Sequence, residues 1–384
     1  MALSVPKLPS VLVVDYVLFS RDIARILAER GFQVSWLSPK RLAVADFEAA
    51  CLKHRPRFLF SINFSPELAF LCSRYQLPYL SWTVDPLPRQ RFRLYPGTDV
   101  TCCRVFCHQR ALVDRFRGLG FRSARFLPLA APDRRVPVAD RSRLESEHCS
   151  VSFVGQSLIR EKVSAQAALR EAGGDTESLD EAEAWLQQLA CSEADAPDFL
   201  GLATRPDLIL PSLRALAESG RLEPDQMIDL LDGWLAHEVR RARVRALTAY
   251  GLQTYGDDGW SCIAGNYRGF ARHYDQLNWV YAASKANLDL PRVYQRDIVT
   301  MRVFDVMACG GVLLSEWQED LADWFVPGEH LMMYRSTAEM VETVSDLLAI
   351  SPMERQAMGH AARNRVISQH RLTSRVEEML RNVP

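Results

Sequence analysis

Two carboxylates eight residues apart, Asp297 and Asp305, flank the start of a predicted helix and have Arg302 between them. We expect Asp297 in the loop before the helix and Asp305 about a turn and a half into it, so that both face the carboxyl ends of neighbouring strands. A carboxylate near a helix amino terminus stays ionised and accepts hydrogen bonds from a ribose diol. A nearby arginine can hold a diphosphate. The pair Gly310–Gly311 then permits a tight turn into the next strand.

A second candidate anion site follows the predicted strand Cys149–Val154, which ends at Gly155. A helix is expected from about Leu158, and a strand–glycine–helix turn can point backbone N–H groups at a phosphate. Arg160 lies in the first turn of that helix, where acidic residues are preferred. Its charge is reasonable there if an anion is bound; a solvated helix face is the alternative.

Four polar residues directly follow strands predicted in the first third of the chain: Asp15, Asn63, Asp85 and His108. Ligands of open parallel sheets bind beyond the carboxyl ends of the strands, which makes these positions functional candidates. Asp85 ranks first because it ends a strand close to an aromatic residue, Trp82. Capping or turn formation is the alternative for each residue. No Gly-x-Gly-x-x-Gly motif follows the first strand, so a dinucleotide site is not expected there.

The nine cysteines do not predict a metal site. Only Cys102, Cys103 and Cys107 cluster, beside His108, and a second pair of ligands with zinc-like spacing is missing. The same residues fit a buried strand, in which free cysteine packs as a small hydrophobic group. The adjacent Asp257 and Asp258 lack the spacing of a metal-binding pair and are interpreted as a turn. We therefore expect no metal.

These residues need elements to position them, and the pattern predicts an α/β protein. Short apolar runs alternate with helical patterns of about ten residues over residues 1–135, which is typical of a doubly wound, Rossmann-like domain. A second α/β domain is expected over 146–351. Residues of about 163–247 within it are rich in Ala, Leu and Glu and have no predicted strand, so they indicate a helical insertion. The chain is expected to end in helix over 352–384.

Composition limits the classes of protein that the chain can represent. Its 384 residues are 48% hydrophobic and 24% charged, which excludes a disordered, collagenous or coiled-coil protein. No apolar run is long enough to span a membrane and no signal peptide is visible, so a cytoplasmic protein is expected. Residues 1–140 contain 21 basic and 11 acidic side chains, and the remainder has an acidic excess. This asymmetry suits an anionic partner of the first domain or docking of the two halves.

The sequence from Arg302 to Ser315, RVFDVMACGGVLLS, with the following Asp320–His330, resembles the nucleotide-sugar-binding segment of GT-B glycosyltransferases. The spore-maturation-protein-like glycosyltransferases are the group that it resembles most. Tyr281–Asp289 is similar to the segment just upstream in that group. The resemblance also includes Ser152–Gly155 with Arg160, and Tyr255–Gly256 with Trp260. In the first domain, the resemblance is limited to the pattern of strands and helices and to the segment that ends at Asp85–Pro86.

The resemblance implies two Rossmann-like domains that face a cleft, the second of which binds a nucleoside diphosphate sugar. A UDP-sugar is the expected donor, with no cofactor. Asp305 matches the acid that holds the ribose, and Asp297 matches the first acid of the Glu-x7-Glu pair of many retaining members, although both are aspartates here. The donor-binding residues implied in this way are Gly155, Arg160, Tyr255, Gly256, Trp260, Asn287, Arg302, Asp305, Gly310 and Gly311.

The implied reaction is the transfer of a sugar without a metal, because arginines and helix dipoles can neutralise the leaving diphosphate. An inverting enzyme would need a general base in the first domain, with Asp85 as first candidate and His108 as second. A retaining enzyme would need no such base, and Asp297 is then the further catalytic candidate. The sequence does not choose between these two mechanisms.

The acceptor is open: a protein, a glycan or a lipid-linked molecule fits, and the basic first domain suits an anionic acceptor or peripheral attachment to the inner face of a membrane. The last helix is expected to cross back to the first domain. Alternatives are a nucleotide-sugar epimerase or hydrolase on the same fold and a non-catalytic sugar-nucleotide-binding protein. Nucleic-acid binding is not expected, because arginine is spread along the whole chain rather than clustered with aromatic residues.

Overall fold

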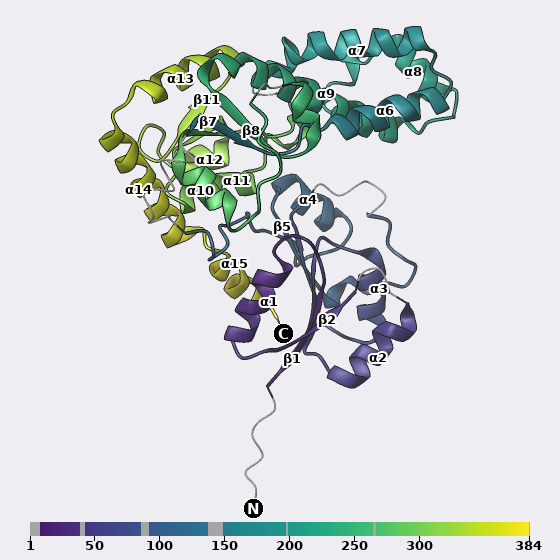
Figure 1. The fold of residues 1–384 in the computed structure, drawn as a ribbon. Helices are drawn as coiled ribbons and strands as arrows, with labels where there is room; N and C mark the ends of the chain where they lie inside the picture. The colour runs from purple at the N-terminus through teal and green to yellow at the C-terminus, as the bar shows by residue number, and fades with distance from the viewer. Residues whose placement is uncertain are drawn as a thin grey trace, which may run out of the picture. The chain divides into compact units, whose positions relative to one another are not determined.

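The computed structural model describes residues 8–38, 43–85, 92–136, 149–196, 199–263 and 266–383. The chain forms two compact units, and the first of them is discontinuous in sequence (Figure 1). It combines Met1–Asp133 with Gln369–Pro384, whereas the second unit is Arg134–Ser368. Both units contain a parallel sheet flanked by helices.

The first unit has a six-stranded sheet in the order β2-β1-β3-β4-β5-β6, in which all pairs are parallel. Its strands are β1 (Ser10–Val14), β2 (Gln33–Leu37), β3 (Phe58–Ile62), β4 (Tyr79–Thr83), β5 (Cys103–Cys107) and β6 (Arg125–Phe126). Its helices are α1 (Ser20–Glu29), α2 (Val44–His54), α3 (Pro66–Arg74), α4 (Arg110–Gly118) and α15 (Leu372–Leu380). Figure 1 shows α1 and α15 on one side of this sheet and α2 and α3 on the other.

The helix starts of the first unit follow from local chemistry. Ser65 caps α3 by accepting a hydrogen bond from the Leu68 amide at 3.2 Å, and Pro66 occupies the first helical position, where its missing N–H costs nothing. Ser20 is a potential capping residue by type, but it is already the first helical residue of α1, and its hydroxyl donates to the carbonyl of Tyr16 at 2.6 Å. The residue before it, Phe19, has a φ of 62°. The chain therefore turns sharply just beyond β1.

The second unit has a five-stranded sheet in the order β11-β10-β9-β7-β8, again with parallel pairs. Its strands are β7 (Cys149–Val154), β8 (Leu252–Tyr255), β9 (Ser284–Asp289), β10 (Leu313–Glu316) and β11 (Met332–Tyr334). The helices that flank this sheet are α10 (Gln276–Ala283), α11 (Met301–Ala308), α12 (Glu319–Trp324), α13 (Thr337–Ala349) and α14 (Pro352–Gln369). The chain passes from β7 to β8 on one side and then to β9 on the other, so the topological switch point lies between β7 and β9.

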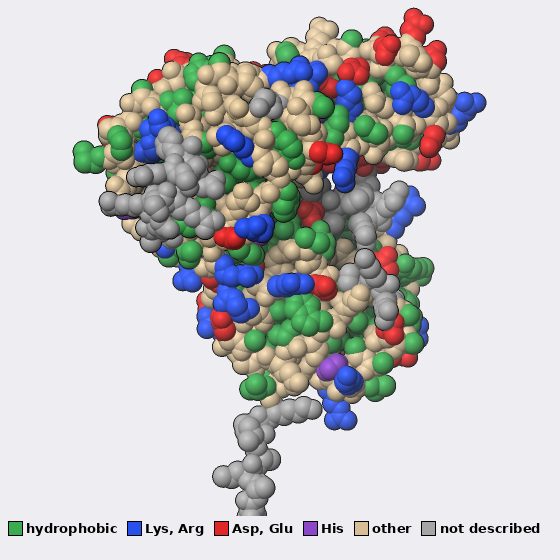
Figure 2. Space-filling view, in the orientation of Figure 1, with side chains coloured by type: hydrophobic (Ala, Val, Ile, Leu, Met, Phe, Trp, Pro, Cys, Tyr) green, Lys and Arg blue, Asp and Glu red, His purple; other side chains and the backbone are tan. Residues whose placement is uncertain are grey.

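A helical lobe is inserted between β7 and β8 (Figure 1). Its helices are α6 (Ile159–Glu171), α7 (Thr176–Ala190), α8 (Pro211–Glu218) and α9 (Pro224–Ala246). The lobe has an apolar core of its own, in which Leu186 and Trp234 are fully buried. Charged side chains of both signs are scattered over the face of the lobe that Figure 2 shows. The longest helix, α9, returns the chain to the sheet and has buried charged residues at its carboxyl-terminal half.

The carboxyl-terminal helical region is broken after Gln369, and α15 belongs to the first unit. Around the break, the Ala131 amide donates to the carbonyl of His370 at 2.9 Å, and the Leu372 amide donates to the carbonyl of Ala131 at 2.9 Å. The guanidinium of Arg375 donates to the carbonyl of Pro128 at 3.0 Å. Figure 2 shows Lys and Arg side chains over α1 and α15 with acidic ones close to them. Part of the basic surplus of this unit is therefore compensated locally.

Candidate functional site

The centre of the candidate site is an ion pair at the switch point of the second sheet. Asp289 ends β9 and is fully buried, and its carboxylate accepts a hydrogen bond from the guanidinium of Arg302 at 2.5 Å. Arg302 stands in the first turn of α11, and its Nε also donates to the carbonyl of Val154 at 2.7 Å. Thr300 adds a hydroxyl to the same carboxylate oxygen at 2.8 Å. These contacts hold Arg302 across the ends of β7 and β9.

Two further arginines surround this pair. Arg240, from α9 of the helical lobe, is 6% exposed and donates to the carbonyls of Gln156 and Leu290, both at 2.8 Å. Burial, followed by the charges of Arg302 and Arg292, lowers the pKa of the Arg240 guanidinium. Arg240 and Arg302 lie 5.6 Å and 5.0 Å from the ring centre of Phe153, on β7. The arrangement concentrates positive charge where ligands of this fold class bind.

Arg292 is the outermost of the three. Its guanidinium lies 3.6 Å from the carboxylate of Glu161 and donates to the hydroxyl of Tyr294 at 2.7 Å. Asp289 faces Arg302 and Glu161 faces Arg292, whereas the contacts of Arg240 are with carbonyl dipoles. We call Arg240, Arg292 and Arg302 the arginine cluster.

The turn after β7 makes two hydrogen bonds to a carboxylate of the chain itself. Its Ser157 amide donates to the carboxylate of Asp257 at 2.7 Å, and the Ser157 hydroxyl donates to the other oxygen at 3.0 Å. The Ser157 amide of this turn is therefore already paired with a carboxylate of the chain, and the predicted contact of the turn with a phosphate stays a prediction. Arg160 is exposed on α6, immediately beyond this turn.

Gly155 and Gly256 bring the ends of β7 and β8 into direct contact. A Cβ on Gly256, whose φ is 153°, would lie 2.1 Å from the carbonyl oxygen of Gly155. The same carbonyl accepts a hydrogen bond from the buried indole of Trp260 at 2.7 Å. Gly155 also passes close to Arg302, since its Cβ would lie 2.8 Å from that guanidinium. Tyr255 is buried, and its hydroxyl donates to Gln253 at 3.0 Å. In this structure these residues shape the edge of the sheet.

Asp305 and Asp297 do not form a pair. Asp305 is 1% exposed, and its Oδ2 accepts a hydrogen bond at 2.9 Å from Arg135, which is equally buried. Asp297 is exposed in the loop before α11. The two carboxylates therefore lie in different surroundings, Asp305 buried beside Arg135 and Asp297 exposed, and their assignment to the donor site stays a prediction.

Three predicted donor-binding residues have packing roles. Asn287 is buried within β9, where its amide donates to the carbonyls of Tyr281 and Val312 and accepts from Ser152. Gly310 and Gly311 lie between the end of α11 and the start of β10, at the amino-terminal ends of the strands, whereas the arginine cluster lies at the carboxyl ends. The observed contacts of Asn287 are structural, and the assignment of all three residues to the donor site stays a prediction.

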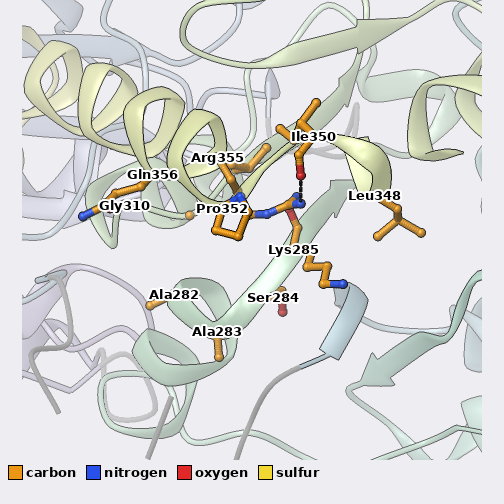
Figure 3. A pocket seen from close by; sticks show the side chains of 12 residues that line it. Ala282, Ala283, Ser284, Lys285, Gly310, Leu348, Ile350, Pro352, Arg355 and Gln356 are labelled. Carbon is orange, nitrogen blue, oxygen red and sulfur yellow. Dashed lines mark hydrogen bonds between the residues drawn. The ribbon is translucent and has the colours of Figure 1, made fainter. Parts of the chain in front are cut away.

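The two glycines line a separate pocket of about 380 Å³, shown in Figure 3. A Cβ on Gly311 would lie 2.4 Å from the carbonyl oxygen of Tyr281, and one on Gly359 of α14 would lie 2.1 Å from that of Gly310. Arg355 crosses this pocket and donates to the carbonyl of Ile350 at 3.0 Å, as the dashed line in Figure 3 marks. Close packing of α11, α14 and β9 therefore requires glycine at these positions.

The first unit brings three of its predicted polar residues together at the carboxyl ends of its strands. The Oδ2 atom of Asp85 accepts hydrogen bonds from the hydroxyl of Tyr16 at 2.6 Å and from the amide of Asn63 at 2.8 Å. The Asn63 side-chain oxygen accepts from the amides of Val84 and Asp85, at 2.9 and 3.1 Å. Asn63 itself has a φ of 60°, a conformation that few residues other than glycine adopt. Burial raises the pKa of Tyr16, and its hydrogen bond to Asp85 adds to this effect. Asp15 is exposed beyond β1.

His108 lies after β5 and is 4% exposed. Its Nδ1 lies 2.8 Å from the carbonyl of Thr83, and a carbonyl can only accept, so Nδ1 carries the proton and Nε2 has the free lone pair. Burial lowers the pKa of His108 to about 4, against smaller opposing effects of Thr83 and Asp85. His108 is therefore a neutral imidazole near neutral pH.

Comparisons with known proteins agree with this architecture. Residues 233–381 match the family model described as glycosyl transferase-like. None of the curated proteins compared with the chain matches it. The solved sucrose-phosphate synthase of Thermosynechococcus elongatus is 12% identical, with a TM-score of 0.56 over 97% of this chain and 98% of that one. The fold is that of the GT-B glycosyltransferases.

Two other GT-B structures show the same similarity. A glycosyltransferase from Rickettsia africae is 10% identical, with a TM-score of 0.54 over 97% of this chain and 99% of that one. Anabaena HepE, solved in complex with UDP-glucose, is 10% identical, with a TM-score of 0.52 over 97% and 98%. The prediction of a GT-B fold is thus confirmed. Within the described ranges, no helix is long and apolar enough to cross a membrane, and no cluster of three potential metal ligands occurs.

Sequence reasoning missed four charged residues that the structure places at or beside the site: Asp289, Arg135, Arg240 and Arg292. Asp289 carried a usable signal, since it is a carboxylate next to the end of an apolar run, as Asp85 is in the first unit. Arg240 lies on a helix without motifs, 84 residues from Gln156. Nothing in the local sequence indicates that contact.

Proposed function

We propose that the protein is a glycosyltransferase that takes its sugar from a nucleoside diphosphate sugar, within the spore-maturation-protein-like group. The observation that carries this proposal is the arginine cluster at the switch point of the second sheet. A nucleoside diphosphate is the leaving group of such a reaction and gains negative charge as the glycosidic bond breaks. Arginines that are fixed in advance stabilise this charge without reorganisation.

Arg240 and Arg302 are the residues that we assign to the diphosphate. Arg302 is held by Asp289 and the carbonyl of Val154, so its remaining N–H groups have a fixed direction. Arg240 supplies a buried charge that carbonyl dipoles only partly offset, and an anion would offset the rest. We propose that these arginines, rather than a metal, neutralise the leaving group.

UDP is the proposed nucleotide, because a structural neighbour, Anabaena HepE, was solved in complex with UDP and glucose and in complex with UDP-glucose. The acceptor is proposed to be a protein, a glycan or a lipid-linked molecule with a free hydroxyl. Peripheral attachment to a membrane is a further proposal, based on the basic excess of the first unit.

The polar cluster of the first unit supports an inverting mechanism. Tyr16 and Asn63 both donate to Oδ2 of Asp85 and thereby fix this carboxylate. In our proposal it takes the proton from the acceptor hydroxyl while the acceptor oxygen forms a bond to the anomeric carbon. The bond between that carbon and the phosphate oxygen breaks, and the nucleoside diphosphate leaves with the electron pair. His108 is the second candidate, although its lowered pKa makes it a weaker base.

A nucleotide-binding panel tests the donor site. We expect UDP, among UDP, GDP, dTDP, ADP and CMP, to raise the melting temperature, since ligand at about 100 times its dissociation constant stabilises by about 2.7 kcal/mol. Arg302→Ala should abolish the shift, whereas the exposed control Arg272→Ala should retain it. Absence of a shift with every nucleotide would overturn the donor site.

A second experiment separates transfer from the alternative chemistries. Wild-type protein incubated with UDP-glucose should release UDP faster when a fraction that contains the acceptor is added. A metal chelator should not change the rate of release. Release at the same rate without any acceptor would favour a hydrolase or epimerase. Binding of UDP-glucose without release under any condition would favour a sugar-nucleotide-binding protein.

A further inference from the structure

Side chains of the second unit enclose one of its own arginines, Arg135, and we call the space that this side chain fills the Arg135 pocket. Arg135 is 1% exposed and lies between α10 and α11. Its guanidinium donates to Asp305 at 2.9 Å and to the side-chain oxygen of Asn278 at 2.8 Å, and it also contacts the carbonyl of His273. The ring centres of Tyr274 and Tyr281 lie 5.2 and 5.7 Å from it.

The fit between Arg135 and this pocket is incomplete. Among the described residues, Oδ1 of Asp305 and Nε of Arg135 are buried and have no hydrogen-bond partner. An arginine and a carboxylate normally satisfy one another through two parallel hydrogen bonds, whereas this pair makes one. Burying an unpartnered carboxylate oxygen costs free energy. The pocket therefore retains an unused acceptor that a hydroxyl donor could satisfy.

The pocket adjoins the arginine cluster. Asp305 follows Arg302 by three residues on α11, which is just under one helical turn. Tyr281 connects the two regions. Burial and then Asp305 raise its pKa, whereas Arg135 and Arg302 both act in the opposite direction. A ligand whose diphosphate lies on the arginine cluster could thus extend a hydroxyl-bearing group to Asp305.

We propose that Arg135 is an internal competitor of the nucleotide donor. This inference rests on the proposed function. In the unliganded protein Arg135 occupies the pocket that ends at Asp305, and a donor must displace it to bring its hydroxyl groups to that carboxylate. Displacement replaces a single hydrogen bond by hydrogen bonds to both oxygens of Asp305. The guanidinium that leaves remains on the chain and refills the pocket when the nucleotide departs.

Removal of the competitor should therefore tighten binding. The apparent dissociation constant is the intrinsic constant divided by the fraction of protein whose pocket is open. A variant whose pocket is always open should therefore have an apparent dissociation constant about tenfold lower, or lower still. We would titrate UDP into wild-type protein, Arg135→Lys and Arg135→Ala by calorimetry, with Arg272→Ala as the exposed control. Arg135→Ala should bind most tightly, Arg135→Lys should be intermediate, and the control should equal wild type. Methylguanidinium should weaken binding to Arg135→Ala only, because it refills the vacated pocket.

The outcomes separate this inference from the proposed function. If wild type binds UDP and folded Arg135→Ala binds it equally well or more weakly, Arg135 is not a competitor and the donor site stands. If neither protein binds any nucleoside diphosphate, the donor site itself fails, and this inference fails with it.

If Arg135→Ala does not fold, chemical labelling of the wild-type chain tests the proposal instead. Phenylglyoxal labels accessible arginines, and mass spectrometry locates the label. Arg135 should be protected in the free protein and become labelled with saturating UDP, while Arg355 should react equally in both states. Continued protection of Arg135 in the UDP complex would overturn the proposal.

Discussion

Arg240 is a buried cation whose contacts are with carbonyl oxygens, and this gives it a testable role at the scale of single residues. Arg240→Met should weaken UDP binding by about tenfold to a hundredfold, since hydrogen bonds to charged groups contribute about 1.5–3 kcal/mol. Calorimetric titration measures the effect. Arg240→Lys should recover part of the affinity, because the charge returns without the second carbonyl contact.

Arg355 provides the matched control for Arg240. Arg355 also donates to carbonyl oxygens, those of Lys285, Leu347 and Ile350, but it lies near the amino-terminal end of β9. Arg355→Met should lower the melting temperature and leave the affinity for UDP unchanged. Equal losses of affinity in the two variants would mean that Arg240 acts only through the stability of the unit.

Asp85 gives a prediction about the chemical step. Asp85→Asn should preserve UDP binding and reduce kcat for transfer by about 10²–10⁴-fold, the usual contribution of a positioned general base. Steady-state kinetics with a fixed acceptor measures this. Tyr16→Phe removes one donor to Asp85 and should have a much smaller effect. A kcat within twofold of wild type in Asp85→Asn would exclude the base and favour a retaining mechanism.

The lowered pKa of His108 predicts that the stability of the first unit depends on pH. Its pKa is about 4 in the folded chain and about 6.5 when unfolded, so between these values the unfolded state binds the extra proton. The contribution of His108 is complete above pH 6.5 and is lost as the pH falls. Between pH 7 and 5 it should decrease by about 2 kcal/mol. Denaturant unfolding of His108→Gln should show a correspondingly flatter dependence of stability on pH, and a slope equal to that of wild type would contradict the prediction.

At the scale of elements, the contact between the ends of β7 and β8 depends on glycine. Gly256→Ala would place a Cβ 2.1 Å from the carbonyl of Gly155 and 3.2 Å from the indole nitrogen of Trp260. We expect a loss of at least 2 kcal/mol of stability, on the order of other backbone clashes, together with weaker UDP binding. Gly269→Ala is the control, because its φ is also positive but the space around it is open. Similar melting temperatures for the two variants would contradict the proposed close approach.

The elements themselves were largely predictable from sequence, and their long-range contacts were not. Apolar runs and capping residues identify β1, β3 and α3 nearly to the residue, because these signals are local. The same reasoning omitted α2, Val44–His54, which lacks a side-chain cap and a strong apolar period. Asp85 and Arg302 were predictable because they stand where strands end or helices begin. Arg135 was not, since only the folded chain brings it to Asp305, 170 residues away.

At the scale of the whole molecule, α15 completes the first unit although it is the last helix in the chain. Its Leu372, Val376 and Met379 are buried, so truncation after residue 368 should destabilise the first unit by on the order of 5 kcal/mol. Calorimetry should show an early transition for this unit and an unchanged one for the second. A single transition at the wild-type temperature would contradict this assignment.

The discontinuity of the first unit also affects how the protein is made. During synthesis, residues 134–368 emerge as one continuous segment, and the second unit can fold as soon as they have left the ribosome. The opening 133 residues must wait for the final sixteen, Gln369–Pro384, with the surface that α15 will cover still exposed to solvent. The amino-terminal third of the chain is therefore expected to reach its native state last. During that interval it is also the part of the nascent chain most in need of a chaperone.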